Sequence, residues 1–260
     1  MKILAIIQAR CNSSRLEKKV LRDIVDGCTS LDYVLTTLKN VEQLDEVVIA
    51  TSVSPEDDAL VDKYGSQYAI CRGAEYDVLD RFCSVIESYH PEHIVRVVSD
   101  NPFMPHEPID ILISSHVENN SAYSSYTLAG KNTMLCSLGL FAEVVSARTL
   151  LELNASLAKD DPYREHVTLS IYKDKQDESV NYLEAAETYV TANNQGVRLT
   201  LDTPEDLNHL RAIAQTFELL PGVNEQSVLN VLKSKYLIKL IADMRTESGK
   251  TKNSKTYEKV

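Results

Sequence analysis

The sequence predicts an α/β fold in which a mostly parallel sheet carries helices on both faces. Short β-branched runs alternate with longer amphipathic stretches through the first part of the chain, as in strand–helix units joined in series. The β-branched runs are apolar at nearly every position, which is typical of strands buried on both faces. Together these two patterns predict a layered α/β domain.

Four strand–helix units account for the first 117 residues. We expect strands at 2–7, 46–52, 68–73 and 93–100, followed in turn by helices at 31–40, 55–65, 77–89 and 107–117. Ser54 stands before Pro55 and Thr203 before Pro204, so that a capping hydroxyl precedes a first-turn proline in both places. These two signals predict the starts of two helices.

The pattern loosens between residues 120 and 190. Mixed segments at 122–127 and 139–145 precede helical stretches at 147–156 and 163–172, and a clear strand is expected at 196–201. Residues 225–244 are expected to be helical. We therefore divide the chain into an α/β domain at 1–220, a helical extension at 221–245 and a mobile, polar tail at 246–260.

Composition restricts the setting and the partners. The five cysteines are odd in number, scattered and without a C-x-x-C pair, which favours a reducing cytoplasm. The apolar start is too short for a signal peptide, and no apolar segment is long enough to span a membrane, so a soluble protein is expected. A net charge of -11 argues against general affinity for nucleic acid. An anionic ligand would need a local basic patch.

The best candidate for such a patch is the segment QARCNSSRLEKKVL, residues 8–21, directly after the first expected strand. It carries Arg10, Arg15 and Lys19 with two serines between them, and it lacks both common glycine-rich phosphate-binding patterns. A solvated surface loop is the alternative reading. Arginine grips phosphate oxygens in bidentate fashion, lysine adds a point charge and serine a neutral donor, so the loop suits a nucleoside triphosphate.

Two aspartates form a second constellation. Asp100 follows the fourth expected strand and Asp202 follows the expected strand at 196–201, where ligands of open α/β sheets bind. Each aspartate alone is ordinary, since one could start a turn and the other could cap a helix. As a pair they are a candidate Mg²⁺ site, because Mg²⁺ is commonly held by one or two carboxylates together with substrate phosphates.

Six motifs in order carry a family resemblance: QARxxSSRLxxKVL, ATSxxPEDD, RGAEYDVLDRF, RVVSDNPF, REHVT and RLTLDTPEDL. From residue 1 to about 215, the chain resembles the cytidylyltransferases of the acylneuraminate and 3-deoxy-manno-octulosonate CMP-sugar synthetase superfamily. The resemblance is strongest to the spore coat polysaccharide biosynthesis protein F type.

The resemblance implies a Rossmann-like nucleotide-diphosphosugar transferase fold. It implies an enzyme that joins CMP from CTP to an acidic sugar, releases pyrophosphate, uses Mg²⁺ and feeds surface polysaccharide or glycan synthesis in the cytoplasm. Neither nucleic acid nor a membrane is an expected partner. Relatives often pair, so a homodimer is possible, with residues 139–145 or the C-terminal helices as its interface.

The site residues follow from the resemblance position by position. The implied catalytic residues are Arg15, Lys19, Asp100 and Asp202, of which the two aspartates would hold the metal. The implied nucleotide-binding residues are Gln8, Ala9, Arg10, Ser13, Ser14, Arg15, Lys19, Thr51, Ser52, Arg72, Asp77 and Arg81. Arg164, Glu165 and His166 are placed near the sugar, with His166 either a base or a packing residue.

The loop departs from the family pattern at three positions, where Asn12, Glu17 and Lys18 replace glycine, proline and glycine. Losing two glycines restricts access to positive-φ conformations, and a carboxylate at Glu17 would repel a triphosphate unless it turned into water. Two rival functions follow. One is a nucleotidyltransferase acting on a sugar phosphate, and the other is a catalytically silent nucleotide-sugar-binding homologue.

Overall fold

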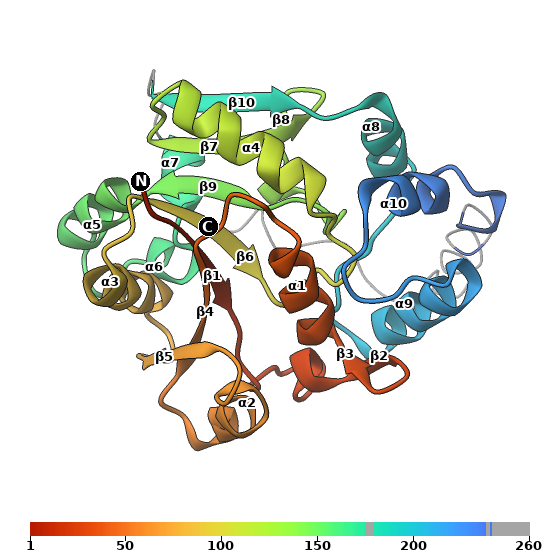
Figure 1. The fold of residues 1–260 in the computed structure, drawn as a ribbon, viewed down its shortest axis with the longest axis horizontal. Helices are drawn as coiled ribbons and strands as arrows, with labels where there is room; N and C mark the ends of the chain where they lie inside the picture. Colours follow the sequence, from red (N-terminus) through yellow and green to blue (C-terminus); the bar gives the residue numbers. More distant parts are fainter. Residues whose placement is uncertain (175–178, 238–239, 241–260) are drawn as a thin grey trace.

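The structure, a computed structural model, describes residues 1–174, 179–237 and 240. Its centre is an eight-stranded sheet (Figure 1). The strands of this sheet are β1 (Ile3–Gln8), β4 (Glu46–Ser52), β5 (Ala69–Gly73), β6 (His93–Val98), β7 (Tyr123–Leu128), β8 (Lys131–Asn132), β9 (Glu143–Ser146) and β10 (Val180–Glu184). A separate two-stranded sheet joins β2 (Asp23–Val25) and β3 (Cys28–Thr29).

The strand order is β10-β7-β9-β6-β1-β4-β5, with β8 paired to β7. Neighbours are parallel in β6-β1-β4-β5 and in β10-β7, whereas β9 runs antiparallel between β6 and β7. The four strands expected in the first hundred residues are therefore confirmed, and their carboxyl ends meet at one edge of the sheet.

Helices cover both faces of this sheet (Figure 1). They are α1 (Ser30–Lys39), α2 (Asp58–Tyr64), α3 (Val78–Tyr89), α4 (Glu107–Glu118), α5 (Ala147–Ser156), α6 (Tyr163–His166), α7 (Leu169–Asp174), α8 (Glu187–Asn194), α9 (Pro204–Phe217) and α10 (Glu225–Leu232). Three 3-10 turns are η1 (Lys19–Leu21), η2 (Pro55–Asp57) and η3 (Thr133–Leu135).

Strand β1 shows why a continuous apolar run is needed at the centre. Ile3, Ala5 and Ile7 belong to the core on the face of α1 and α4, whereas Leu4 and Ile6 belong to the core on the face of α3 and α5. Both sets of side chains are almost fully buried. The apolar character of successive residues thus reflects two cores that share one strand.

The two predicted caps have different outcomes. Thr203 caps α9 as expected, since its hydroxyl accepts from Asp206 N while the Asp206 carboxylate accepts from Thr203 N. Ser54 does not cap a helix, because its hydroxyl donates to Glu56 instead and the chain first makes the turn η2. Helix α2 then begins three residues later than the proline signal predicts.

Three segments differ from the sequence expectation. Residues 196–201 form no strand: Gly196 lies in a turn, and the segment is joined to the loop after β6 by one backbone hydrogen bond, from Leu201 N to Asp100 O at 2.8 Å. Residues 163–172 form two helices instead of one, separated at Val167, whose φ is 57°. Residues 139–145 lead into β9, in the interior of the sheet, so they are not the dimer interface considered above.

Beyond residue 220 the chain continues to pack on the domain. Helix α10 contacts α8 and α9, and its Val228, Val231 and Leu232 belong to the core on the α1 face. This helix ends at Leu232, and residues 235–237 are helical again after a turn, so the single helix expected over 225–244 is interrupted; residues 238–239 and 241–244 lie outside the described residues. The expected mobile tail, residues 246–260, lies outside the described residues.

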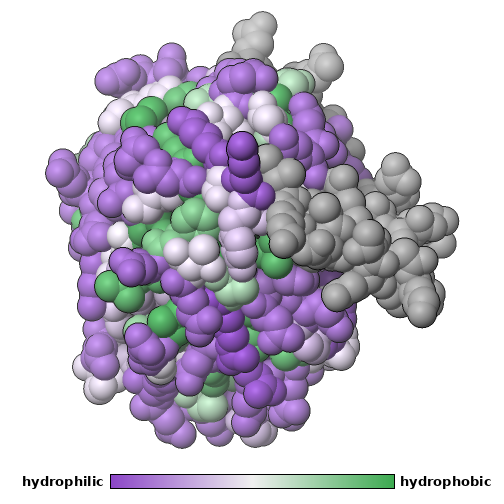
Figure 2. Space-filling model, turned by 90° about the vertical axis from the view of Figure 1, so that its right-hand side faces the viewer, coloured by the Kyte–Doolittle hydropathy of each residue, from purple (hydrophilic) through white to green (hydrophobic). Residues whose placement is uncertain are grey.

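From the side of α8, α9 and α10, the described surface is mainly hydrophilic, with apolar residues in small separate groups (Figure 2). None of the helices in the described part of the chain has the length and apolar character needed to cross a bilayer.

Two histidines lie in contact between β6 and α4. His93 Nδ1 is 3.1 Å from His116 Nε2, and His116 Nδ1 is 2.8 Å from Ser124 Oγ. His116 is completely buried. Burial, together with neighbouring His93, lowers the pKa of His116 from 6.5 to about 4.

We therefore expect stability to fall in acid. The unfolded chain binds a proton at His116 below pH 6.5, whereas the folded protein resists it down to about pH 4. The free energy of unfolding should decrease between these values, by up to about 1.4 kcal/mol per pH unit for this group. Urea unfolding of the wild type and His116→Gln from pH 4 to 8 measures it. Identical pH profiles of the two proteins would contradict the assignment.

Candidate active site

A cleft of about 660 Å³ opens where the carboxyl ends of β1 and β6 meet. Its walls come from the loop after β1, the loop after β6, the segment 131–141, helix α6 and the segment 198–202 before α9. It gathers ten of the residues expected from the sequence: Gln8, Arg10, Ser13, Ser14, Arg15, Lys19, Asp100, Glu165, His166 and Asp202. Parallel strands place these distant segments together at one edge.

The centre of the cleft is a cluster of charges around one ammonium group. Lys19 Nζ donates to Asp100 Oδ2 at 2.7 Å and to Asp202 Oδ1 at 2.9 Å. Arg15 reaches the same Asp202 oxygen at 2.9 Å, and Arg198 binds its other oxygen. The two aspartates and the cations of the loop therefore converge.

These contacts fix the protonation states. Burial alone would lower the pKa of the Lys19 ammonium, but the carboxylates of Asp100 and Asp202 outweigh it and raise that pKa above its ordinary value. Burial would likewise raise the pKa of the Asp202 carboxyl, yet Lys19, Arg15 and Arg198 together lower it. Both groups are charged at neutral pH.

Local structure delivers Asp202 to this position without a strand. Leu201 N donates to Asp100 O, which joins the segment before α9 to the loop after β6. Asp206, the residue of the α9 capping box, also accepts from Asp202 N at 3.0 Å. One helix start and one backbone bond thus hold the two aspartates side by side.

Hydrogen bonds from backbone N–H groups hold the basic loop in place. Cys11 N donates to Asp57 Oδ1 at 2.6 Å, and Lys18 N donates to Cys11 O at 3.0 Å. Lys18, which stands where the family pattern has glycine, adopts the left-handed conformation with φ 52°. Asn12 is not among the positive-φ residues, and Glu17 is exposed. Of the two positions where the family pattern has glycine, only Lys18 adopts a positive φ, and Asn12 does not.

The donor set fits a divalent cation bound mainly by a ligand. Asp100 and Asp202 already share one cation, Lys19 Nζ, so their carboxylates are close enough to share a divalent ion. Within the part of the chain that the structure describes, no group of three or more His, Cys, Asp or Glu side chains is placed to hold a metal. Two carboxylates leave the remaining positions to phosphate oxygens and water, as Mg²⁺ prefers.

Seven of the expected site residues do not line the cleft. They are Ala9, Thr51, Ser52, Arg72, Asp77, Arg81 and Arg164. Arg164 is buried and donates to Asp77 Oδ2 at 2.8 Å, and Asp77 in turn caps α3 by accepting from Asp80 N. Arg164 and Asp77 thus tie α6 to the start of α3.

The two arginines of the R-G-x-x-x-D-V-L-x-R signature also make backbone contacts. Arg72 donates to the carbonyls of Ser52 and Ser54 at 2.8 and 2.9 Å, and the wholly buried Arg81 donates to those of Ala74 and Glu75. Their contact with a nucleotide stays a prediction, as it does for Thr51 and Ser52, which are buried at the end of β4.

Sequence reasoning missed several residues that line the cleft. They are Asn12, Arg96, Asn101, Lys131, Thr133, Arg198 and Thr200, with apolar neighbours from 134–141. Arg198 and Thr200 could have been found, because they alternate with the buried Val197, Leu199 and Leu201. The segment 131–141 carries no such signal, since only its folding beside β7 brings it to the cleft.

A buried ion pair supports the floor of the cleft. Glu143 on β9 is fully buried and accepts from Arg96 Nη1, from Tyr123 Oη at 2.6 Å and from Thr168 Oγ1 at 2.8 Å. Thr168 follows Val167, where Thr168 N donates to His166 O in a tight three-residue turn. The network thus links β6, β7 and β9 to the turn that follows Glu165 and His166.

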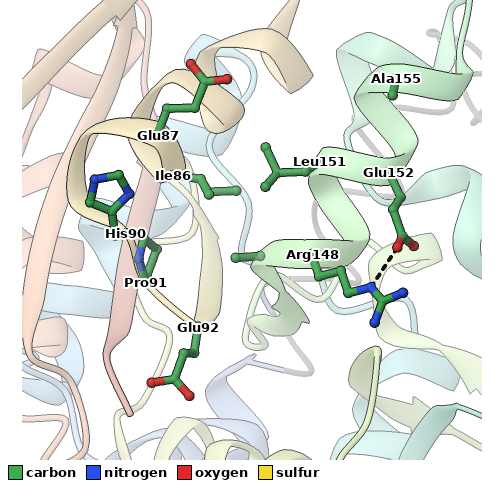
Figure 3. A pocket seen from close by; sticks show the side chains of 10 residues that line it. Ile86, Glu87, His90, Pro91, Glu92, Arg148, Leu151, Glu152 and Ala155 are labelled. Carbon is green, nitrogen blue, oxygen red and sulfur yellow. Dashed lines mark hydrogen bonds and ion pairs between the residues drawn. The ribbon is translucent and has the colours of Figure 1, made fainter.

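A second hollow, of about 750 Å³, lies between α3 and α5 (Figure 3). It is lined by Ile86, His90, Leu151 and their neighbours, and its one ion pair drawn is Arg148 with Glu152. His90 and Glu92 precede β6, so this hollow lies toward the amino end of that strand. It brings no cluster of cations and hydroxyls together.

Comparison with known proteins agrees with this geometry. The mostly parallel sheet with an ionic cleft at its carboxyl edge is that of an α/β nucleotidyltransferase. The chain belongs to the cytidylyltransferase family, whose model matches residues 4–233. It is 36% identical over 235 residues to the spore coat polysaccharide biosynthesis protein SpsF of Bacillus subtilis, covering 88% of this chain and 93% of that protein.

Solved structures show the same fold. A cytidylyltransferase from Leptospira borgpetersenii superposes with a TM-score of 0.76 at 22% identity, covering 97% of this chain and 99% of the other. A CMP:2-keto-3-deoxy-manno-octonic acid synthetase complexed with CTP gives a TM-score of 0.62 at 18% identity, covering 84% of this chain and 100% of the other. The nucleotide-diphosphosugar transferase fold expected from the sequence is confirmed.

Replacing Lys18 with glycine should stabilise the loop. Glycine accepts the left-handed conformation without steric cost, although it also gives the unfolded chain more conformational entropy. The net effect expected for Lys18→Gly is a rise of about 0.5 kcal/mol in the free energy of unfolding. Lys18→Ala keeps Cβ and is the matched control. Chemical denaturation of both variants measures the difference, and a glycine variant less stable than the alanine variant would contradict the assignment.

Removing the charge of Glu143 should destabilise the fold. Glu143→Gln leaves the Arg96 guanidinium buried without its counterion, which is expected to lower the free energy of unfolding by about 3 kcal/mol. The control is Glu152→Gln, in the exposed ion pair with Arg148, which should leave stability nearly unchanged. Equal effects of the two substitutions in urea unfolding would argue against a supporting role for the buried pair.

Proposed function

We propose that this protein transfers CMP from CTP to the anomeric hydroxyl of an acidic sugar and releases pyrophosphate. The observation that carries the proposal is the placement of Lys19 between Asp100 and Asp202, in a cleft that also holds Arg10 and Arg15. The names of the matched relatives support a role in surface polysaccharide or glycan synthesis and an acidic acceptor.

In the proposed reaction, the sugar hydroxyl oxygen forms a bond to the α-phosphorus of CTP. The bond from that phosphorus to the bridging oxygen breaks, and pyrophosphate leaves with the electron pair. Such transfers need alignment and charge stabilisation more than a protein nucleophile. Arg10, Arg15 and Lys19 would hold the β- and γ-phosphate oxygens, and Ser13 and Ser14 would add neutral donors.

Asp100 and Asp202 would hold Mg²⁺ when CTP is present. The ion would supply positive charge at the phosphates. The same carboxylates contact Lys19 and Arg15 in the structure, so both cations would exchange a carboxylate for a phosphate when the nucleotide binds. The charge cluster would thus hold the loop ready for a triphosphate.

His166 is the candidate acceptor for the proton of the sugar hydroxyl. It lines the cleft beside Glu165, which is 3.4 Å from Arg10. Burial lowers the pKa of His166; Glu165 opposes that effect and Arg96 adds to it. The imidazole is therefore neutral at pH 7 and able to take a proton.

We also propose a cytoplasmic location and a homodimer. All five cysteines are free in the structure, which supports a reducing compartment. Because residues 139–145 lie inside the fold, the C-terminal helical region is the remaining candidate for the dimer interface.

The test is pyrophosphate release with each of the four nucleoside triphosphates, Mg²⁺ and a panel of acidic sugars. We expect release with CTP alone, slowed at least about 100-fold in Asp100→Asn and Asp202→Asn, because each loses charge at the transferring phosphate. Asp62→Asn, at an exposed position on α2, is the control.

Thermal unfolding should show that all three variants fold. Release with a sugar phosphate in place of an acidic sugar would overturn the acceptor assignment. Absence of triphosphate binding by the wild type would favour a silent homologue.

A further inference from the structure

Three oxygen atoms of residues that line the cleft have no hydrogen-bond partner in the described part of the protein. They are Asn101 Oδ1, Thr133 Oγ1 and Thr200 Oγ1. All three residues line the cleft, and Asn101 and Thr133 are only 7% and 5% exposed. A buried polar atom without a partner has given up its bonds to water and gained none. Such atoms in a cleft are available to bond to a ligand.

Gly139 shows how closely this wall is assembled. A Cβ atom added to Gly139 would lie 2.8 Å from Thr200 Cγ2 and 3.0 Å from Asn101 Oδ1. Asn101 and Thr200 therefore meet at one point, although they come from different segments. Gly139 also has φ +72°, a conformation that glycine adopts without strain. The bare backbone at Gly139 lets the segment carrying Thr133 close against the other two residues.

The chemistry of the wall suits hydroxyl groups. A threonine hydroxyl can donate and accept, and an amide oxygen accepts, so each atom can bond to a sugar hydroxyl. The Asn101 oxygen only accepts, so it can bond to a sugar hydroxyl but not to a phosphate oxygen. Lys131, on β8 next to Thr133's segment, adds a cation at the cleft, and no ion pair to it occurs among the described residues. A cation suits a carboxylate.

We propose that Asn101, Thr133 and Thr200 bind the hydroxyl groups of the acceptor sugar and that Lys131 faces its carboxylate. This inference rests on the proposed function, because it names the acceptor subsite of the same cleft. Under this proposal, the segment 131–139 together with Asn101 and Thr200 determines which polyhydroxylated acid the protein accepts.

The test compares Thr133→Val, Thr200→Val and Lys131→Met with the wild type. The matched control is Ser170→Ala, because the Ser170 hydroxyl is also buried and without a partner but does not line the cleft. The probes are 3-deoxy-manno-octulosonate and N-acetylneuraminate, each with CTP and Mg²⁺. The measured quantities are the KM for the sugar, the KM for CTP and the unfolding midpoint of the protein without ligands.

We expect the sugar KM to rise about fivefold or more in each of the three variants, as for the loss of one hydrogen bond or ion pair. The KM for CTP should stay unchanged, and the unfolding midpoints of both valine variants should not fall, since each removes a polar atom without a partner. A sugar KM unchanged in both valine variants, as in Ser170→Ala, would overturn the proposal. So would a rise in both KM values together with a lower unfolding midpoint, which indicates a structural role.

Failure of the proposed function gives a different result. If the wild type releases no pyrophosphate with either sugar, the transfer reaction is wrong for these acceptors, and calorimetric titration of the same sugars then tests the wall directly. Binding to the wild type that is lost in Thr133→Val supports the subsite. No binding of either sugar to the wild type overturns it.

Discussion

The candidate site depends on one ammonium group shared by two carboxylates. Lys19 enters from the loop after β1, Asp100 from the loop after β6 and Asp202 from the segment before α9, and the three meet at distances of 2.7 and 2.9 Å. Without a cation between them the two carboxylates would repel each other. This contact therefore joins three segments that are distant in the sequence. When CTP binds, a phosphate could replace the carboxylates as the partner of Lys19, and a divalent ion could replace Lys19 between the carboxylates.

The surrounding structure holds this arrangement by a few hydrogen bonds. The capping box of α9 fixes Asp202, one backbone bond joins Asp100 to Leu201, and Asp57 anchors the basic loop through Cys11 N. Lys18 supplies the left-handed turn that a glycine would otherwise provide. The departures of this loop from the family pattern are thus accommodated by conformation and exposure, with the phosphate-binding side-chain types left in place.

Much of this could be predicted from the sequence, because the signals are local. The apolar runs at 46–52 and 68–73 became β4 and β5, and the charge pattern of residues 8–21 marked one wall of the cleft. The segment 196–201 has the alternation of a strand, and its side chains do alternate between core and cleft, but no neighbouring strand pairs with it. A pattern of side chains predicts which face is buried, whereas pairing depends on what lies next to the segment.

The remaining differences are also tertiary in origin. Arg164 stands in the same motif as Glu165 and His166, yet it is turned away from the cleft to pair with Asp77, 87 residues earlier in the chain. The wall that contains Thr133 and Gly139 has no motif at all, and it reaches the cleft through the hairpin of β7 and β8. Neither contact can be read from local spacing.

The central claim is that the cations gathered around Asp100 and Asp202 bind the phosphates of CTP. Calorimetric titration of CTP into the wild type and Lys19→Met, each with Mg²⁺, tests it most directly. We expect the substitution to weaken CTP binding at least about tenfold, as for the loss of a charged contact to phosphate. Equal affinity of the two proteins for CTP would contradict it.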